Sequence, residues 1–246
     1  NNLWAAEYLL FASDQTNACP SSDSINRDGL WDAVDEQALI GRRLAYVALV
    51  ARTVLEAAQS LHDSWSPSGD NFMLELSAAG EGSRTYGKKR VGINAVSDAF
   101  GYVEWGMKEN KLGRPLGLFD CDRDDCSDEV EAKFSGRSLA HLKNNMLGFR
   151  KLFVGCGEMN EGLGFDDFLV AIGSPELAGQ IEEASQTVIS SLSEIDEPNL
   201  ISALASDRES IVSLHRSVAS LSLLLRGDFL IVLNLELPQM VQGDND

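Results

Sequence analysis

The sequence predicts an all-α protein. In five separate segments, apolar residues recur at steps of three and four positions, which places them along one face of an α-helix. Almost no segment alternates strictly between apolar and polar residues, as a half-buried β-strand does. The chain has 246 residues, 44% of them hydrophobic, so it has enough apolar side chains for a substantial core.

Two of these segments lie in the first half of the chain. The first spans residues 40–61, and the sequence Ser-Pro-Ser-Gly at residues 66–69 is typical of a helix end. Its apolar positions are Ile40, Leu44, Val47, Ala51, Val54, Ala58 and Leu61. The second spans residues 93–107 and is closed by Gly113 and Pro115. Its apolar positions are Ile93, Val96, Phe100, Val103 and Met107.

The third and fourth segments follow a loop. Residues 139–153 form the third, with Ser135 or Ser138 as the expected N-cap. Its apolar positions are Leu139, Leu142, Met146, Phe149 and Phe153. The fourth begins at Ser174, because the proline that follows suits the first helical position. Its apolar positions are Leu177, Ile181, Ala184, Val188, Leu192 and Ile195.

The fifth segment begins at a capping box formed by Ser206 and Glu209. Its apolar positions are Ile211, Leu214, Val218, Leu221 and Leu225. Residues 229–233, Phe-Leu-Ile-Val-Leu, have the composition of a strand. In this helical context we interpret them as a buried helix or an extended tail.

The charge of the chain excludes one class of partner. Its 38 acidic and 20 basic residues give a net charge of −18, and its longest basic run is Lys88-Lys89-Arg90. Such a surface repels nucleic acid and anionic membranes. The most apolar region, residues 221–237, is interrupted by charged residues, whereas a membrane span needs about 20 apolar residues. We therefore expect no nucleic-acid partner and no membrane-spanning helix in this chain.

The four cysteines all lie outside the periodic segments. An even number in such positions favours disulfides in an oxidising compartment, and the alternative is four free thiols in a cytosolic protein. Four cysteines allow three pairings. We prefer Cys121 with Cys126, which flank a short acidic loop, over pairings that involve Cys19 or Cys156.

The acidic loop has part of a calcium-binding pattern. Oxygen ligands at alternating positions, closed by a bidentate glutamate at position 12, are typical of a calcium loop. Asp120, Asp122 and Asp124 alternate, and Glu131 takes the twelfth position. Asp125 stands where such a loop requires glycine. The alternative is a solvated acidic loop without a cation.

Four segments of the chain resemble the imelysin family, bacterial envelope proteins linked to iron uptake and once described as metallopeptidases. The first dozen residues resemble its Gly-x-His-x-x-Glu signature; aligned on Glu7, Trp4 takes the place of the histidine and Asn2 that of the glycine. The other segments are Lys-Leu-Gly-Arg-Pro-Leu-Gly at residues 111–117, Ser-Gly-Arg-Ser-Leu at residues 135–139 with Asn144-Asn145, and Gly-Leu-Gly-Phe-Asp-Asp-Phe-Leu at residues 162–169.

This resemblance implies two helical-bundle domains with a site in the cleft between them. We place the domains at residues 1–117 and 118–246, because turn residues and a run of acids separate them. Family members carry a signal sequence and further helices before the signature. We therefore expect the first domain to be incomplete and an upstream segment of the same protein to pack against residues 40–61. The implied location is the periplasm or the outer membrane, as a lipoprotein, with other envelope iron-uptake proteins as partners.

The signature substitution changes the expected metal chemistry. A histidine and a glutamate three residues apart share a helix face and supply two ligands to iron or zinc. The indole of Trp4 is a donor only, so Glu7 is left as one ligand among several or as a buried carboxylate paired with a Lys or Arg. Residues in the family-like segments, including the substituted Trp4, then form the predicted ligand site. They are Trp4, Lys111, Arg114, Ser138 and Asn145.

We predict no catalytic residues. None of His62, His141 and His215 has an acid, histidine or cysteine three or four positions away, and neither a His-Glu-x-x-His nor a Gly-x-Ser-x-Gly motif occurs. The first hypothesis is therefore a non-enzymatic envelope protein for iron or metal uptake, with a degenerate metal motif. One alternative is a divergent ligand-binding or scaffold protein that has lost the metal. A metallopeptidase is the other, disfavoured by the absent ligand set.

Overall fold

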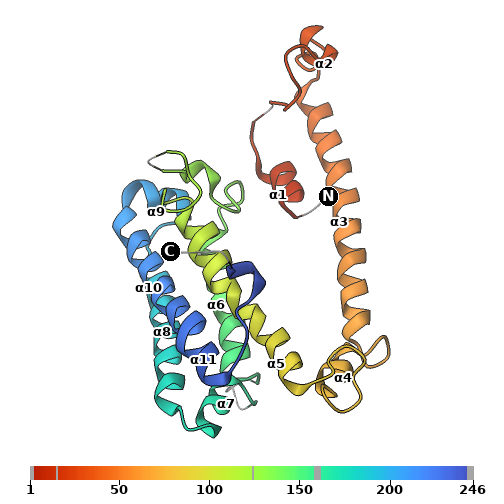
Figure 1. The fold of residues 1–246 in the computed structure, drawn as a ribbon. Coiled ribbons are helices and arrows are strands. Elements are labelled where there is room, and N and C mark those ends of the chain that lie inside the picture. Colours follow the sequence, from red (N-terminus) through yellow and green to blue (C-terminus); the bar gives the residue numbers. More distant parts are fainter. Residues whose placement is uncertain (1–2, 15, 124, 158–161, 243–246) are drawn as a thin grey trace. The chain divides into compact units, whose positions relative to one another are not determined.

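The computed structural model describes residues 3–14, 16–123, 125–157 and 162–242. Within these ranges the chain forms helices and no β-strand, which confirms the predicted all-α class (Figure 1). It divides into two compact units, residues 1–74 and residues 75–246. The predicted domain boundary between residues 117 and 118 falls inside the second unit, where the helix before it packs against the helices that follow.

The first unit is built on one long helix. Its helices are α1 (Leu3–Phe11), α2 (Ser24–Arg27), α3 (Glu36–Trp65) and the start of α4 (Phe72–Ser77). The carboxylate of Asp35 caps α3 by accepting a hydrogen bond from the Ala38 amide, 2.9 Å away. The helix ends at Ser66, where the sequence predicts the end.

The short helix α1 packs along α3, and one arginine fixes the segment that follows it. Arg43 of α3 donates to the carbonyls of Ala12 (2.7 Å) and Asp14 (2.5 Å). Its guanidinium carbon also lies 5.6 Å from the centre of the Tyr8 ring. Within the described residues of this unit, the buried apolar side chains are Ala12, Leu39 and Val50. The stripe predicted along α3 therefore stays largely exposed.

The second unit contains most of the helices. They are α5 (Lys89–Ser97), η1 (Asp98–Phe100), η2 (Val103–Gly113), η3 (Ser127–Glu129), α6 (Ser138–Phe153), α7 (Phe165–Ala171), α8 (Pro175–Glu194), α9 (Leu200–Ser206), α10 (Arg208–Leu224), η4 (Leu225–Phe229), α11 (Leu230–Leu233) and η5 (Gln239–Val241). Helix α10 packs against α8 on one side and η2 on the other, and α8 also contacts α6 and α7. In this unit the predicted apolar stripes meet in one continuous core.

Aromatic rings fill the centre of that core. The Phe100 ring makes edge contacts with Phe149 and Phe165, with ring centres 5.1 Å apart in both pairs. Phe229 also lies against Phe100, at 5.5 Å. Together with Phe153 of the same cluster, these phenylalanines come from four helical segments, η1, α6, α7 and η4. Residues 229–233 are helical, which settles the two alternatives for that segment in favour of the helix.

The second predicted helix changes its geometry along its length. The sequence predicts one α-helix through residues 93–107, but the chain passes from α5 through the 3-10 turn η1 into the π-helix η2. At its end the Arg114 amide donates to the Glu109 carbonyl, five residues earlier, at 2.8 Å. Most of η2 is buried on all sides, because it lies between α6 and α10. An apolar stripe with a 3.6-residue period carries no signal for this geometry.

Two predicted caps are corrected by the structure. The N-cap of α6 is Arg137, and the Ser138 hydroxyl instead donates to the carbonyl of Glu131. Helix α10 is capped by Asp207, whose carboxylate accepts from the Ser210 amide at 3.4 Å, because Ser206 still belongs to α9. The predicted start of α8 is confirmed, with Pro175 in the first turn. None of the helices in the described ranges is both long and apolar enough to span a membrane.

Candidate functional site

The signature segment forms helix α1. Trp4 and Glu7 lie three residues apart on this helix, and 65% of the Trp4 surface is exposed. An indole N–H has no lone pair for a metal, so α1 offers at most one carboxylate where the family motif offers two ligands. The donor set of α1 does not fit a two-ligand iron or zinc pair.

A pocket of about 370 Å³ lies beside α1 in the first unit. Tyr8 and Leu9 of the signature segment line it together with Trp31, Arg42 and Arg43. Arg43 is bound to the backbone after α1, as described above, whereas the Arg42 side chain makes no ion pair or hydrogen bond among the described residues. This pocket joins aromatic surface to one unpaired cation.

The second unit has a buried network of charges on the π-helix η2. Lys108 Nζ lies 2.6 Å from Glu104 Oε1 and 2.6 Å from Glu109 Oε1, and both carboxylates are almost completely buried. Arg226 of the second π-helix, η4, places Nη1 3.5 Å from Glu104 Oε1. Ser222 of α10 donates its hydroxyl to Glu104 Oε2. Two carboxylates thus meet two cations, so this network has no surplus negative charge.

The network shifts the pKa values of its members. Burial raises the pKa of Glu104, but hydrogen bonds from Lys108 and Ser222 and the charges of Lys108 and Arg226 outweigh it, so the pKa lies below 4.5, its ordinary value. Burial lowers the pKa of Lys108, yet its two carboxylate partners raise it overall. The pKa of His215 on α10 is lowered by burial and by the charge of Lys108. His215 is therefore neutral at pH 7.

The residues predicted from the resemblance meet on another side of η2. Lys111 Nζ lies 2.9 Å from Glu131 Oε2 and 2.8 Å from Asn145 Oδ1. The hydroxyl of Ser138 reaches the backbone of Glu131. Lys111 also lies 5.4 Å from the centre of the Tyr102 ring. The structure thus brings Lys111, Ser138 and Asn145 together around Glu131, and it engages Lys111 in an internal ion pair.

Tyr102 is held against η2 by a glycine. A Cβ atom at Gly106 would lie 2.5 Å from the Tyr102 ring, so any side chain at this position would displace it. The ring in turn covers Lys111. Gly106 is buried, and nothing in the helical periodicity marks it as a contact position.

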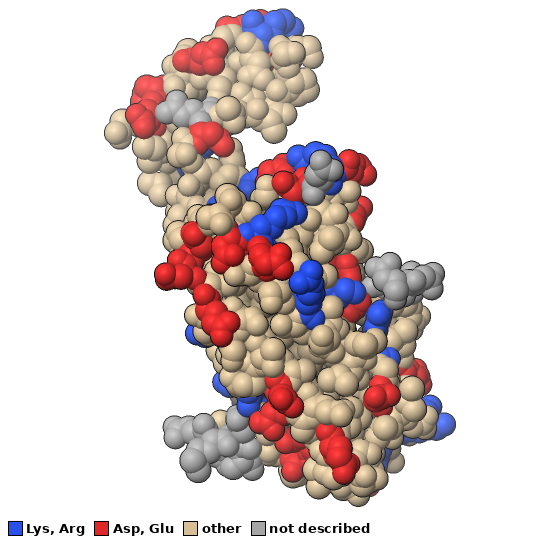
Figure 2. All heavy atoms as spheres, turned by 90° about the vertical axis from the view of Figure 1, so that its left-hand side faces the viewer, with Lys and Arg blue, Asp and Glu red and all other residues tan. Residues whose placement is uncertain are grey.

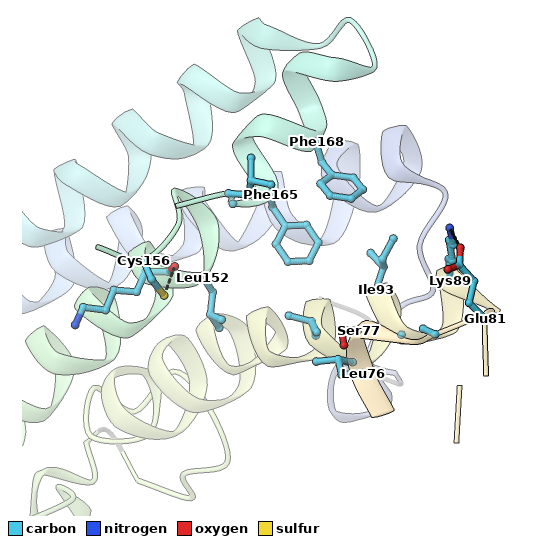
Figure 3. A pocket seen from close by; sticks show the side chains of 15 residues that line it. Leu76, Ser77, Glu81, Lys89, Ile93, Leu152, Cys156, Phe165 and Phe168 are labelled. Atoms are coloured by element: carbon cyan, nitrogen blue, oxygen red, sulfur yellow. Dashed lines mark hydrogen bonds and ion pairs between the residues drawn. The ribbon is translucent and has the colours of Figure 1, made fainter. Parts of the chain in front are cut away.

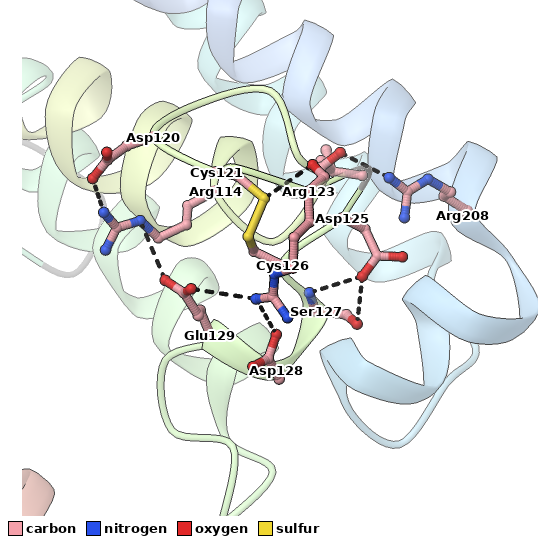
Figure 4. The surroundings of a disulfide bond; sticks show 11 residues. Arg114, Asp120, Cys121, Arg123, Asp125, Cys126, Ser127, Asp128, Glu129 and Arg208 are labelled. Atoms are coloured by element: carbon pink, nitrogen blue, oxygen red, sulfur yellow. Dashed lines mark hydrogen bonds and ion pairs between the residues drawn. A yellow bond between two sulfur atoms is a disulfide. The ribbon is translucent and has the colours of Figure 1, made fainter.

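The disulfide predicted between Cys121 and Cys126 is present, and it closes the acidic loop (Figure 4). Arginines engage the acids on this loop. Arg114 forms an ion pair with Asp120, and its Nε lies 3.6 Å from Glu129 Oε2. Arg123 Nη2 lies 2.7 Å from Asp128 Oδ1. Arg114 therefore pairs with acids of the loop, whereas Lys111 contacts Glu131 and Asn145.

The predicted calcium ligands are distributed over different partners. Asp120 pairs with Arg114 and Glu131 pairs with Lys111, while Asp122 is exposed and Asp124 lies outside the described residues. Across the part of the chain that the structure describes, no three acids, histidines or cysteines are close enough to hold a metal ion. The calcium site remains a prediction without geometric support.

The histidines lie on three different helices. His62 on α3 is exposed, with Nδ1 3.2 Å from the carboxylate of its neighbour Asp63. His141 on α6 places Nδ1 3.7 Å from Glu131 Oε2, and His215 on α10 borders the charged network. Each histidine thus has its own acidic or charged surroundings.

A larger cavity lies elsewhere in the second unit, with a volume of about 500 Å³ (Figure 3). Its walls come from the end of α4 and the segment after it, from α5, from the end of α6, and from α7 with the described residues that precede it. Among its lining residues are Leu76, Ile93, Leu152, Phe165 and Phe168. The sequence gives no prediction for this cavity, although the stretch at residues 162–169 that resembles the family motif supplies both phenylalanines.

Sequence reasoning also missed the charged network on η2. One signal was present: Glu104 and Lys108 are spaced four residues apart, which places opposite charges on the same side of a helix that also carries the apolar positions Val103 and Met107. Arg226 was visible as a charge that interrupts an apolar stretch. Buried charges are almost always paired, so charges at core positions of different helices indicate mutual partners.

The molecular surface agrees with the composition. Acidic and basic side chains are interspersed over the face shown in Figure 2, with uncharged surface between them. No extended basic area appears on that face.

Comparison with known proteins gives one match. The sequence model of a protein family described as imelysin matches residues 3–225, from the first residue of α1 to the first residue of η4. The match thus includes the signature helix, the π-helix η2 and the acidic loop. No curated protein and no solved structure matches the chain.

Proposed function

The chain belongs to the imelysin family, and from this membership we propose a non-enzymatic envelope protein that acts in iron or other metal acquisition with a degenerate metal motif. The observation that carries the proposal is the exposed Trp4 on α1, next to Glu7, where the family motif has its histidine. With one carboxylate in place of a two-ligand pair, intrinsic affinity for iron or zinc is weak.

Among the described residues of the second unit, the ion pairs on η2 oppose a strong metal site. Glu104 and Glu109 of η2 and Glu131, which pairs with η2, each already face a lysine within 3 Å. A metal ion could use one of them only by displacing that lysine into a buried environment. Because an unpaired buried charge is costly, such displacement opposes metal binding.

The arrangement of the histidines supports a non-enzymatic role. A catalytic zinc site needs three protein ligands that converge on one point. The three histidines of this chain lie on α3, α6 and α10 with different partners. A metallopeptidase is therefore the least supported of the three functions.

We place the protein in the periplasm or at the outer membrane. The disulfide between Cys121 and Cys126 supports an oxidising compartment. The proposal includes a lipid anchor outside these residues and other envelope iron-uptake proteins as partners.

We also propose that further helices of the same polypeptide cover α3. Ile40, Leu44 and Leu55 lie along this helix and are 43%, 55% and 56% exposed. A stripe of large apolar side chains on a 30-residue helix is typical of a bundle face that packs against another helix. An upstream segment that raises the hydrogen-exchange protection of α3 when added would support this proposal.

One observation favours the second function, a ligand-binding protein that has lost the metal. The pocket beside α1 combines Tyr8 and Trp31 with the unpaired guanidinium of Arg42. Aromatic surface next to a cation suits an organic anion better than a metal ion. In this case the signature segment would still form the site, but through Tyr8 and Leu9 rather than Glu7.

Calorimetric titration with ferrous and ferric iron separates these functions. We expect weak binding by the unmodified chain and stronger binding by the variant Trp4→His, because the imidazole restores the second ligand of the pair. Glu7→Ala in the Trp4→His background should remove the gain. Tight binding by the unmodified chain that Glu7→Ala abolishes would show an intact metal site instead. If Trp4→His gains nothing, the signature helix does not form a metal site and the ligand-binding function is favoured.

An assay on unfolded protein substrates addresses the peptidase alternative. We expect no hydrolysis above the background of a Glu7→Gln variant, with or without added zinc. Chelator-sensitive hydrolysis that Glu7→Gln removes would overturn the non-enzymatic function.

A further inference from the structure

We propose that the 500 Å³ cavity of the second unit binds a small, uncharged aromatic molecule. This site lies in the α5–α6–α7 region and is independent of the signature helix α1. Its volume falls within the range of about 300–1,000 Å³ that is typical of small-molecule sites.

The walls of the cavity are apolar and include two aromatic rings. Phe165 and Phe168 of α7 lie on one side, with their rings toward Ile93 of α5 and Leu76 of α4 (Figure 3). Leu152 of α6 adds a further aliphatic wall. Aromatic rings prefer offset-stacked or edge-to-face contact with other rings, so these walls favour a planar aromatic guest over a compact polar one.

The charges around the cavity argue for an uncharged ligand. At one end, Lys89 Nζ and Glu81 Oε1 are 2.5 Å apart and neutralise each other. Lys151 lines the other end, next to the thiol of Cys156, whose sulfur lies 3.7 Å from the Lys151 carbonyl oxygen. Between these ends the lining is mainly apolar, with the Ser77 side chain as its polar member. A charged group placed there would lose its hydration. Lys151, which makes no ion pair among the described residues, is the one cation that an anionic ligand could use, and the comparison of 2-naphthol with 2-naphthoate below separates that case.

The cavity is held open by the packing behind it. Phe165 is fixed between Phe100 and Phe229, with ring centres 5.1 Å and 5.5 Å away. A Cβ atom at Gly92 would lie 2.8 Å from the Cβ of Ala79, so α5 and the segment after α4 are in close contact. A cavity formed by such fixed elements needs little reorganisation to accept a ligand, which favours binding.

Helix α7 is equally well anchored at its start. The amide of Gly164, the N-cap residue, donates to the Asp167 carboxylate at 2.9 Å. A Cβ atom at Gly164 would meet the Phe153 carbonyl oxygen and the Gly155 amide. The position therefore requires glycine, and it orients both phenylalanines of α7 toward the cavity.

Fluorescence titration with N-phenyl-1-naphthylamine, an uncharged aromatic probe, tests the proposal. We expect saturable binding of one probe per chain. Phe168→Ala should weaken it about tenfold, because it removes one aromatic wall. Val170→Ala is the matched control, since Val170 is also exposed on α7 but does not line the cavity. It should leave the affinity within twofold.

A second pair of variants fills the cavity instead of opening it. Leu152→Trp should reduce probe binding at least tenfold, because the larger side chain occupies part of the space. Leu147→Trp is its control, on the same helix and similarly exposed, at 44% against 40% for Leu152. Circular dichroism and thermal unfolding would show that all four variants are folded. Equal probe affinity in each variant and its control would overturn the proposal.

The free cysteines provide a readout that does not depend on mutation. Cys156 lines the cavity, whereas Cys19 lies in the first unit, and both are exposed thiols. We expect 2-naphthol at saturating concentration to slow maleimide labelling of Cys156 several-fold and to leave Cys19 unchanged, as measured by peptide mass spectrometry. Unchanged or equally slowed labelling of the two thiols would contradict binding in this cavity. If 2-naphthoate competes with the probe and 2-naphthol does not, the ligand class is an anion and the proposal of an uncharged ligand is wrong.

Discussion

The two units of the chain bury their helices to very different extents. Helix α3 of the first unit has 30 residues, of which Leu39 and Val50 are buried. Helix α10 of the second unit has 17 residues and buries Ile211, Leu214 and Val218 among others. Both helices show the same apolar periodicity in the sequence. Periodicity therefore identifies a face that is able to pack, while neighbouring helices determine whether it does.

The second unit also buries charges, which the first does not within its described residues. Its core is large enough to enclose Glu104, Glu109 and Lys111, and η2 brings cations to each of the carboxylates. A buried ion pair is weak evidence of net stability, but the removal of one partner is strongly destabilising. The stability of η2 therefore depends on every charged residue of this network.

The largest expected difference between the units is in hydrogen exchange. We expect amides of α8 and α10 to exchange roughly a thousandfold more slowly than amides of α3. The hydrogen bonds of α8 and α10 break only when the whole core of the second unit unfolds. Exchange of the intact chain followed by mass spectrometry measures both units in one sample. Equal protection of α3 and α10 would contradict the comparison and show that α3 is covered in solution.

Leucine truncations should show the same contrast in stability. Leu214→Ala should lower the free energy of unfolding by roughly 4 kcal/mol, because Leu214 is completely buried. Leu55→Ala on α3 removes the same atoms from a side chain that is 56% exposed and should cost less than about 0.5 kcal/mol. Urea unfolding gives both values. Similar costs for the two variants would show that α3 packs as tightly as α10.

The charged network should make the stability of the second unit depend on pH. Glu104→Gln should destabilise it by roughly 3 kcal/mol at pH 7, because Lys108 and Arg226 lose a buried partner. The pKa of Glu104 is lower in the folded state, so the unfolded chain takes up the proton first as the pH falls. The contribution of Glu104 is therefore complete above about pH 4.5 and is lost as the pH falls further through the folded pKa.

Urea unfolding of both proteins between pH 3 and pH 7 tests this sign. The difference in the free energy of unfolding between the unmodified chain and Glu104→Gln should become smaller as the pH falls toward 3. Glu36→Gln at the exposed start of α3 is the control variant in the other unit, measured over the same pH range. A difference that grows as the pH falls would contradict the lowered pKa.

Of these four predictions, the loss of the disulfide should have the smallest effect on stability. Replacement of Cys121 and Cys126 by alanine should cost about 2 kcal/mol, because the chain-entropy model assigns little to so short a loop. A Cys19→Ala and Cys156→Ala double variant leaves the bond intact and should match the unmodified chain. A larger loss, confined to the second unit, would show that the loop also orders Arg114, which pairs with Asp120 and Glu129.

Much of the local structure was determined by the sequence itself. The stripe at residues 40–61 and the Ser-Pro start at residue 174 placed α3 and α8 correctly, because side-chain spacing and proline geometry act within a few residues. The pairing of Cys121 with Cys126 was predicted for the same reason, since a short loop limits the choice of partner. The four family-like segments identified the family, which the match over residues 3–225 confirms.

The tertiary structure alone decided the geometry of the interior. The π-helical form of η2, the burial of Glu104 and the contact of Lys111 with Asn145 depend on side chains up to 118 positions apart. The cavity likewise forms where α5, α6 and α7 lie next to one another, and no local sequence pattern predicts that these helices become neighbours. The physical reason is the same in each case: burial and charge pairing depend on which segments become neighbours, and local propensities leave that open.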